Sequence, residues 1–548
     1  MNRVVVLLSF LSIVAAPVRA QDDSHAACAA PPSYVPVDLL EREVGLRKGV
    51  GNSRETVATT SKDAQAFYNQ GLNYLESYVW IEASRSFHQA LRLDPDLAMA
   101  YVGLSRTHSG LDDPAGAKLY FEKAKALAPK ASDRERRRIA IREAQLAAME
   151  NIEDTAKLQA YRKVVDDALA IDIDDPQLWL LAGNAQEANA AGRGQRGTAA
   201  TVAYYDQVLR LVPNHASAHH YLVHSYETIG LIDKALEHGE VFARMAPSIP
   251  HAAHMWGHDL RRVGRIDDAI VEFKKADALE NAYYKAENID PSFDWHHTHN
   301  LDLLATCYQH KGQMSLAEST MREAVALGGR DAYRAFNTRI LPAFLIHRAR
   351  YDEALEAARA MLELPYAQSR TVGYALAAQA LIGLGRIPEA RLELMSAESE
   401  LEKVPVVTPG IVPRRSMVEG WVVAARGELL LETGQTDEAG RILKEAQQAL
   451  RAAPGPDAWT QALFRLETMA RSAREGGDWD LAEYTAQQML DHDAAYGGSH
   501  LAMALVLDHK GDAAGAKREL EAARKYWRDA DRDLPELKQI ATALASAR

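Results

Sequence analysis

Residues 67–95 read FYNQGLNYLESYVWIEASRSFHQALRLDP, and residues 101–129 read YVGLSRTHSGLDDPAGAKLYFEKAKALAP. The second stretch repeats the pattern of the first at a spacing of 34 residues, with aromatic, small and proline residues at matching places. A fixed period of this length is typical of a chain that stacks one supersecondary unit on the next. The matching pairs are Phe67 and Tyr101, Gly71 and Ser105, Tyr74 and His108, Ala83 and Ala117, Phe87 and Phe121, Ala90 and Ala124, and Pro95 and Pro129.

The residue types at these positions suit a unit of two packed helices, A and B. Small residues at Gly71 and Ala83 let the two helices approach closely, and Phe87 fills the space toward the next unit. Pro95 ends helix B and begins the next unit. At these positions the sequence resembles the tetratricopeptide repeat. The resemblance implies an all-α fold, a right-handed superhelical solenoid of about eleven to twelve helix pairs.

Weaker copies continue the register, so that the resemblance covers roughly residues 63–525. Residues 131–176 are interpreted as an irregular helix pair, and residues 402–418 as a proline-rich linker that marks a break between two lobes. We therefore expect a repeat array at 63–401 and further repeats of the same kind at 419–548. Each weaker copy centres on an alanine that follows a Gly-x-x-x-x-Ala or related turn, and these alanines are Ala354, Ala390, Ala439, Ala482 and Ala516.

Composition limits the kinds of partner that the chain suits. It has 548 residues, of which 47% are hydrophobic and 7% aromatic, and its net charge is −12. An acidic surface disfavours nucleic acid and anionic membranes as partners. No stretch after the N-terminus approaches about eighteen apolar residues, so we expect no membrane span. The two cysteines, Cys28 and Cys307, do not make a disulfide framework in a chain of this length.

The N-terminus has the three parts of a signal peptide, which we assign to residues 1–20. Arg3 supplies a basic start, Val4 to Ala16 an apolar run, and the Val-Arg-Ala sequence at 18–20 a cleavage site of small residues. We therefore expect an exported protein, periplasmic or secreted. Residues 21–62, which are rich in Asp, Pro, Thr and Ser, are expected to pack as an extended N-terminal arm.

Histidines gather in one part of the chain, because 12 of the 19 lie within residues 215–310. In tetratricopeptide repeats, the fifth and ninth positions of helix A face the concave groove. The fourth clear repeat has His220 and His224 at those positions, and the fifth has His254 and His258. Each i,i+4 pair lies on one helical face, and neighbouring helices stand roughly 8–10 Å apart. We therefore expect the four imidazoles to converge.

These residue types predict a transition-metal site. His254 and His258 form H-x-x-x-H, which suits a metal held from one helix, and His299 enters the next repeat. Imidazole ligands, with carboxylates such as Glu227 in reach, suit Zn, Cu, Fe or Ni better than Mg or Ca. The region is also similar to an exported, histidine-rich tetratricopeptide subfamily of unknown activity. The motifs that carry this resemblance are HHYxxH at 219–224, HMxxH at 254–258 and HNL at 299–301.

An insertion of about fourteen residues, from Ala282 to Trp295, separates the fifth and sixth repeats. A solenoid repeat needs no extra residues here, so we interpret the insertion as a flap over the histidines. The alternative is a loop on the convex side that covers the repeat junction. In a flap, the side chains expected to contact a ligand are Tyr284, Trp295, His296 and His297.

Three functions stay open at this point. The first is a binding protein whose groove holds a metal site and a peptide or protein partner. The second is a metal-dependent enzyme in which Glu227 acts as a base on a metal-bound water. The third is a plain scaffold of an envelope complex, in which the polar groove binds a peptide carboxylate. The sequence contains no glycine-rich phosphate loop, nucleophile elbow, CxxC or HExxH motif.

Overall fold

The computed structural model describes residues 35–546, except for residues 188–189, 191–194, 196, 329–331, 407–414 and 453–455. Within these residues the chain forms helices joined by turns, and it has no β-strand. None of the described helices is long and apolar enough to cross a membrane. The predicted signal peptide, and residues 21–34 of the predicted arm, lie outside the described residues.

Consecutive helices pack as pairs, and each pair packs against the next, so the all-α repeat array predicted from the sequence is confirmed. Twelve pairs can be traced through the described residues. The first six are α2 (Lys62–Glu76) with α3 (Trp80–Leu93), α4 (Ala98–Gly110) with α5 (Pro114–Leu127), α6 (Asp133–Met149) with α7 (Thr155–Ile171), α8 (Pro176–Ala185) with α9 (Ala199–Leu211), α10 (Ala216–Thr228) with α11 (Ile232–Met245), and α12 (Pro250–Arg262) with α13 (Ile266–Glu287).

The array continues to the C-terminal part of the chain in the same manner. The other six pairs are α14 (His296–His310) with α15 (Met314–Ala326), α17 (Ile340–His347) with α18 (Tyr351–Ala360), α19 (Ala367–Gly383) with α20 (Ile387–Leu401), α21 (Arg415–Glu432) with α22 (Thr436–Ala452), α23 (Pro456–Glu475) with α24 (Trp479–His492), and α25 (Gly497–His509) with α26 (Ala513–Tyr526). Outside the pairs lie α1 (Val37–Leu40), α16 (Ala332–Asn337) and α27 (Pro535–Ser546).

Small residues set how closely the helices of a pair approach, as the repeat pattern predicts. A side-chain carbon built on Gly71 of α2 would lie 2.7 Å from the ring of Phe87 in α3, and one on Gly103 of α4 would lie 2.5 Å from the same ring. Phe87 is fully buried, so its ring fills the space between the first pair and the second. Gly257 of α12 faces Phe273 of α13 in the same way, at 2.8 Å.

The turn from helix A to helix B has a recurrent backbone conformation. Glycine adopts its left-handed φ without steric cost, whereas another side chain there costs about 1–3 kcal/mol. The first pair nevertheless has Tyr78 at this position, with φ 60°, and Asp112 and Ala349 take similar angles in two other pairs. Seven turns have a glycine with φ between 69° and 80°, namely Gly230, Gly264, Gly312, Gly385, Gly434, Gly477 and Gly511.

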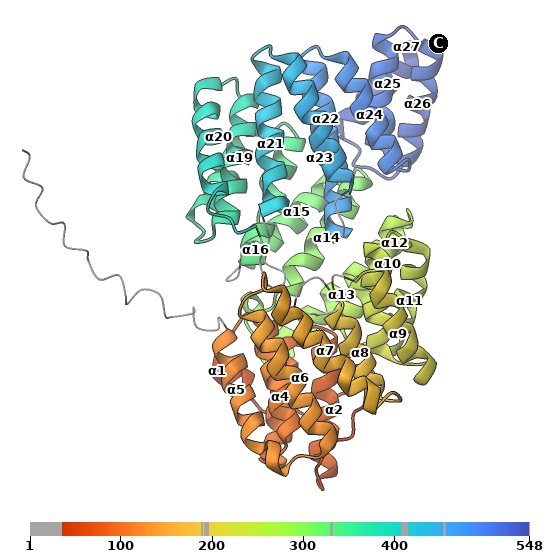
Figure 1. The fold of residues 1–548 in the computed structure, drawn as a ribbon. Helices are drawn as coiled ribbons and strands as arrows, with labels where there is room; N and C mark the ends of the chain where they lie inside the picture. Colours follow the sequence, from red (N-terminus) through yellow and green to blue (C-terminus); the bar gives the residue numbers. More distant parts are fainter. Residues whose placement is uncertain are drawn as a thin grey trace, which may run out of the picture.

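The solenoid closes on itself twice, in two successive turns (Figure 1). In the first turn, the junction of α2 and α3 returns to contact α10 and the residue before α14. The backbone carbonyl of Glu76 lies 2.7 Å from His220 Nδ1, and the indole N–H of Trp295 donates to the carbonyl of Tyr78 at 3.1 Å. These contacts join the first helix pair to residues more than 140 positions away.

In the second turn, the C-terminal helices return to α12 and α14. The indole N–H of Trp527 donates to the carbonyl of His310 at 3.1 Å, and Arg261 lies 3.1 Å from Asp493. The two turns have separate hydrophobic cores. The main core of the first turn has residues between Val35 and Trp295, and a smaller one beside it has residues from Ile141 to Ala190. The core of the second turn has residues from Leu260 onward. Helices α12 to α14 therefore belong to both turns.

The proline-rich segment at 402–418 does not separate two lobes, in contrast to the interpretation from the sequence. Helix α19 packs against α21 across it, and one hydrophobic core runs through both sides. Val404 and Val418, near the ends of the segment, are themselves buried in that core. Apolar flanks thus keep the repeats in contact, and the change from one core to the other falls at α12 to α14 instead.

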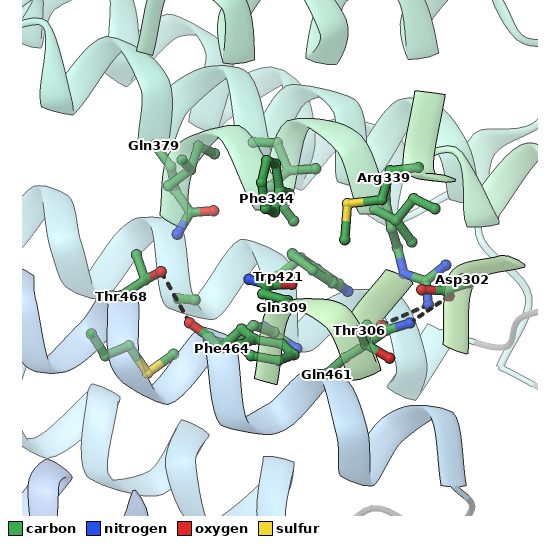
Figure 2. A pocket seen from close by; sticks show the side chains of 18 of the residues that line it. Asp302, Thr306, Gln309, Arg339, Phe344, Gln379, Trp421, Gln461, Phe464 and Thr468 are labelled. Carbon is green, nitrogen blue, oxygen red and sulfur yellow. Dashed lines mark hydrogen bonds between the residues drawn. The ribbon is translucent and has the colours of Figure 1, made fainter. Parts of the chain in front are cut away.

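The second turn encloses a pocket between α14, α17, α19, α21 and α23 (Figure 2). The pocket holds about 610 Å³ of empty space, part of it open to solvent. Its walls combine aromatic rings with a few charged side chains, and we return to it below.

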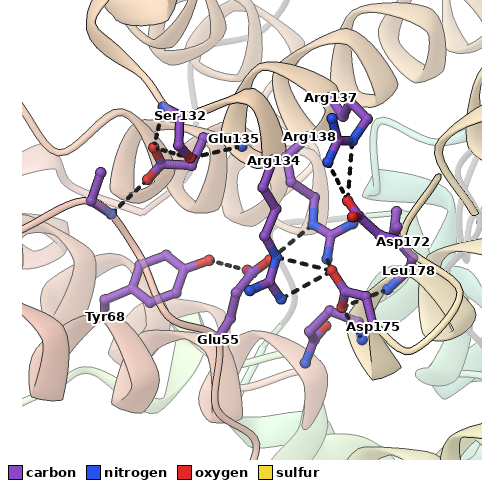
Figure 3. A network of polar contacts seen from close by, with 12 residues as sticks. Glu55, Tyr68, Ser132, Arg134, Glu135, Arg137, Arg138, Asp172, Asp175 and Leu178 are labelled. Carbon is purple, nitrogen blue, oxygen red and sulfur yellow. Dashed lines mark hydrogen bonds and ion pairs between the residues drawn. The ribbon is translucent and has the colours of Figure 1, made fainter.

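In the first turn, residues 35–61 cross the helix-A side of the repeats along a mostly extended path (Figure 3). Glu55 accepts hydrogen bonds from Tyr68 at 2.6 Å and from Arg138 at 2.8 Å, and Arg138 also donates to Asp175 at 2.7 Å. Burial raises the pKa of Glu55, but Arg138 and Tyr68 outweigh it and hold that pKa below its ordinary value. A paired, buried carboxylate therefore fixes the segment inside the first turn.

We predict that Gly257→Ala lowers the free energy of unfolding by about 1–3 kcal/mol, because the added carbon would overlap Phe273. Denaturant melts measure the change. Gly420→Ala in α21 is the matched control, because its added carbon would meet only Arg465, at 3.8 Å, and alanine is the better helix former. Equal stability of the two variants would contradict the packing described for α12 and α13.

Candidate metal centre

Three successive A helices, α10, α12 and α14, bring histidines together where the first turn closes. His220 and His254 are fully buried, and even the most accessible of the seven, His224, exposes only 12% of its side chain. Imidazoles seldom gather in this number away from water, because each brings polar nitrogens that need partners. The seven are His220 and His224 on α10, His251, His254 and His258 on α12, and His296 and His299 on α14.

The ring nitrogens of these histidines fall into three overlapping groups of three. Within each group, one nitrogen of every ring lies within 4.8 Å of the others. The first and third groups, which we call the outer groups, share no residue, whereas the second shares one histidine with each. The groups are His220, His224 and His251; His251, His254 and His296; and His254, His258 and His299.

The five metal ligands predicted from the sequence lie in the two outer groups, but they do not meet at one point. His220 and His224 belong to the first group, and the third consists of His254, His258 and His299. The separation follows from the repeat itself. Each i,i+4 pair runs along its own helix, and neighbouring helix axes stand about 8–10 Å apart.

Two further histidines connect the groups, and the sequence interpretation did not count them as ligands. His251 completes the first group, and His296 completes the second. His251 has a sequence signal that identifies it in retrospect. It lies three residues before His254, a spacing that puts both on one face of α12. His296 begins α14 and was assigned to the flap instead.

The first group has nitrogen separations that fit a coordinated metal. His220 Nε2 lies 3.2 Å from His224 Nε2 and 3.1 Å from His251 Nε2. A tetrahedral ion with nitrogens at about 2.0–2.1 Å has ligand–ligand edges of about 3.3–3.4 Å. His220 Nδ1 donates to the carbonyl of Glu76, so its Nε2 carries the lone pair that a metal needs.

Five other buried ring nitrogens of the cluster have no hydrogen-bond partner among the described residues. An orphaned polar atom of this kind costs about 1–3 kcal/mol, whereas a bound cation would satisfy the nitrogens that ligate it. Two of them belong to rings whose other nitrogen is anchored, which aims the free nitrogen into the cluster. The five are His251 Nδ1, His254 Nε2, His258 Nδ1, His258 Nε2 and His296 Nε2.

The anchored rings are those of His254 and His296. His254 Nδ1 lies 2.9 Å from Asn300 Oδ1, and the Asn300 amide donates to the Phe273 carbonyl at 2.9 Å, so the amide oxygen faces the ring. His296 Nδ1 makes a short contact with Glu280. Burial raises the pKa of Glu280 and lowers that of His296.

Glu227, the candidate catalytic base, lies between the two outer groups. Its carboxylate is 3.6 Å from His224 Nδ1 and 3.4 Å from His258 Nδ1. Burial would raise the pKa of Glu227, but the neighbouring imidazoles of His224 and His258 hold it at about 2. Burial and the charge of Glu227 raise the pKa of the adjacent Asp259, which stays protonated. Glu227 is thus an ionised acceptor that orients one ring of each outer group.

Two aromatic side chains cover the cluster. The ring of Tyr78, in its strained turn, lies 4.6 Å from the ring of His220 and 5.3 Å from that of His251. Trp295, from the predicted flap, lies 5.8 Å from His251 and 6.1 Å from His299 on the other side. Both side chains are buried, so the covering is part of the packed core.

The rest of the insertion has a different position. Helix α13 continues to Glu287, so the first six inserted residues extend it rather than form a loop. His297 contacts Asp277 at 2.8 Å, and Tyr284 packs 5.5 Å from the His297 ring. Neither His297 nor Tyr284 belongs to any of the three groups.

Comparisons with known proteins add little to this description. No protein-family profile matches the chain, and no curated protein sequence matches it either. The crystal structure of yeast Tom70 is 14% identical, with a TM-score of 0.34, and the match covers 88% of this chain and 95% of that one. The human IFIT1 dimer with PPP-AAAA is 14% identical, with a TM-score of 0.35 and coverages of 83% and 89%. The description of this fold therefore rests on its own helix pairs.

The cluster makes the stability of the metal-free protein depend on pH. Burial, and then the charges of neighbouring histidines, lower the pKa values of His251, His254 and His296 well below 6.5, and burial does the same for His220. Below pH 6.5 the unfolded chain therefore binds protons that the folded chain does not. Stability falls as pH drops through this range, and these groups leave it unchanged at higher pH.

We predict that replacing His251 and His254 together by Gln flattens this dependence between pH 6.5 and 5. Each buried histidine contributes up to about 1.4 kcal/mol per pH unit, so the double variant loses up to about twice that slope. Urea unfolding of the chelator-treated proteins measures the slopes. Identical slopes for the variant and the natural chain would contradict the assignment of these rings as neutral and buried.

Proposed function

We propose that the chain is an exported, tetratricopeptide-like metal-binding protein that holds two transition-metal ions, one in each outer histidine group. The observations that carry this proposal are the close Nε2 atoms of His220, His224 and His251 in the first group, and the buried, orphaned ring nitrogens of His254 and His258 in the third. Charged ammonium or guanidinium groups do not fill the space between them, and apolar packing would leave them unsatisfied. A cation with imidazole affinity satisfies them.

The donor set selects the class of metal. Neutral imidazoles favour Zn, Cu, Fe or Ni over Mg or Ca, which prefer oxygen ligands. Three histidines per ion leave a further coordination position on the metal. Glu227 contacts the Nδ1 atoms of His224 and His258 and so orients both rings. The middle group shares His251 and His254 with the outer groups. We therefore assign no third ion to it.

A second candidate function is a metal-dependent enzyme. A pocket of about 380 Å³ is lined by Tyr78 and Tyr221, and both rings contact His220, with centroids 4.6 Å and 5.2 Å away. The two tyrosine rings therefore stand between this pocket and the first group. Glu227 is a poor base for such an enzyme, because a pKa of about 2 lies far from neutral pH. Its role would be to orient ligands.

A peptide-binding scaffold is the third candidate, and the groove of the first turn supports it least. Residues 35–61 already occupy that groove. Two hydrogen bonds fix them there: Arg138 donates to Glu55, and the Ser53 amide donates to Asn73 Oδ1 at 2.8 Å. A peptide or protein partner would have to bind elsewhere on the array. No feature of the described residues favours nucleic acid.

We predict that the purified native protein carries about two transition-metal ions per chain. Replacing His254 and His258 together by Gln should leave about one ion, because it removes two ligands of the third group only. Replacing His220 and His224 together by Gln should do the same at the first group. Inductively coupled plasma mass spectrometry, normalised to amino-acid analysis, measures the metal.

The matched control replaces His88 and His500, which lie outside the cluster, by Gln. This variant should keep both ions. A metal-free natural protein would refute the proposed function, and so would equal metal content in all variants. If either cluster variant loses both ions, the two outer groups form a single site and the stoichiometry is wrong.

Export is a separate part of the proposal, supported by the basic, apolar and small-residue parts of residues 1–20. Expressed with its N-terminus intact in a bacterial host, the chain should be recovered from the periplasmic or secreted fraction with Gln21 as its first residue. Edman sequencing identifies that residue. As a second test, residues 1–20 are fused to a reporter enzyme. Export would be contradicted if the chain stays in the cytoplasm with residues 1–20 intact and the fusion is not cleaved either.

A further inference from the structure

The pocket of the second turn is lined by aromatic and charged side chains that are not part of the metal centre (Figure 2). It has about 610 Å³ of empty space, part of it open to solvent, so a ligand can enter from outside. Trp421, Phe344 and Phe464 line it, and all three are buried against the surrounding helices. Apolar walls of this kind bind the body of an organic molecule.

Arg465 brings a positive charge to these walls. Its guanidinium lies 4.0 Å from the centre of the Trp421 ring, and one of its amino groups donates to the carbonyl of Gly420 at 2.7 Å. Within the described residues it makes no ion pair with a carboxylate. Its remaining N–H donors are available to the pocket, and a guanidinium presents them as a fork that matches a carboxylate.

The groups around Arg465 do not neutralise it. Burial, and then the charge of Arg339, lower the pKa of Arg465 to about 9. Arg339 is committed to other partners, because it donates to Gln461 at 2.7 Å, and Gln461 in turn donates to Asp302 at 2.9 Å. Burial also raises the pKa of Glu428 to about 7, so that carboxyl offsets the charge only in part.

We propose that this pocket binds a small organic carboxylate, with the carboxylate on Arg465 and an apolar body against Trp421 and Phe464. A cationic ligand would add to the charges of Arg465 and Arg339. A neutral apolar ligand would bury the Arg465 guanidinium without a counter-charge. Asp302 and His299 lie one helical turn apart on α14, yet Asp302 lines the pocket while His299 belongs to the metal centre. The inference is independent of metal binding.

The test uses 3-phenylpropionate as the probe, titrated into the purified full-length protein by calorimetry and by tryptophan fluorescence. We expect saturable binding with a dissociation constant of about 1 mM or tighter. Acetate lacks the apolar body, and 3-phenylpropionamide lacks the charge, so both should bind at least about tenfold more weakly. Arg465→Gln should weaken 3-phenylpropionate to the same extent, because it removes the fork and the charge.

Arg426→Gln, on the exposed side of α21, is the matched control and should bind the probe normally. The melting temperature of Arg465→Gln should equal or exceed that of the natural chain, since the variant removes a buried and unpaired charge. No binding of the probe at about 10 mM overturns the proposal. Equal affinity for the amide, or for Arg465→Gln, also overturns it. Repeating the titration on chelator-treated protein separates this result from metal binding.

Discussion

The contact between the first helix pair and α10 is the constraint on which the metal centre depends. It seats the Glu76 carbonyl on His220 Nδ1 and the Tyr78 ring over three histidines. An open solenoid would leave α10, α12 and α14 facing water, where imidazoles need no partner. Closure removes that water and leaves ring nitrogens that only each other, or a cation, can satisfy. Tyr78 has a strained, left-handed backbone at a position where seven other turns have glycine. This strain is consistent with a role for its ring in covering the histidines.

Helix α14 contributes side chains to both sites, the metal centre in the first turn and the pocket in the second. On α14, His296 and His299 face the closure of the first turn, whereas Asp302, Thr306 and Gln309 face the pocket of the second. The two sites also differ in electrostatics. Burial stabilises neutral imidazoles in the first, and it leaves a guanidinium without a counter-ion in the second. A repeat protein can build both because each helix pair contacts mainly its neighbours.

The sequence predicts the repeat array well and the site in part, for physical reasons. Small residues such as Gly71 and Gly257 face a large ring in the next helix. This packing is local and recurs every 34 residues, so the sequence period predicts it. His220, His224, His254 and His258 follow from the same register. The division into two outer groups follows from the spacing of the helices, whereas the burial of the rings depends on ring closure. Closure joins α2 to α10 through contacts that no periodicity encodes. Proline content led us to expect a break at 402–418, but it says nothing of the buried Val404 and Val418 near the ends of that segment.

The central claim is that histidine nitrogens, and not carboxylates or thiolates, hold the metal. X-ray absorption at the metal edge of the protein as isolated tests it most directly. The account predicts a shell of nitrogen or oxygen atoms at about 2.0–2.1 Å, with the outer-shell scattering of about three imidazole rings per ion. A shell dominated by sulfur, or one of oxygen atoms without imidazole scattering, would contradict it.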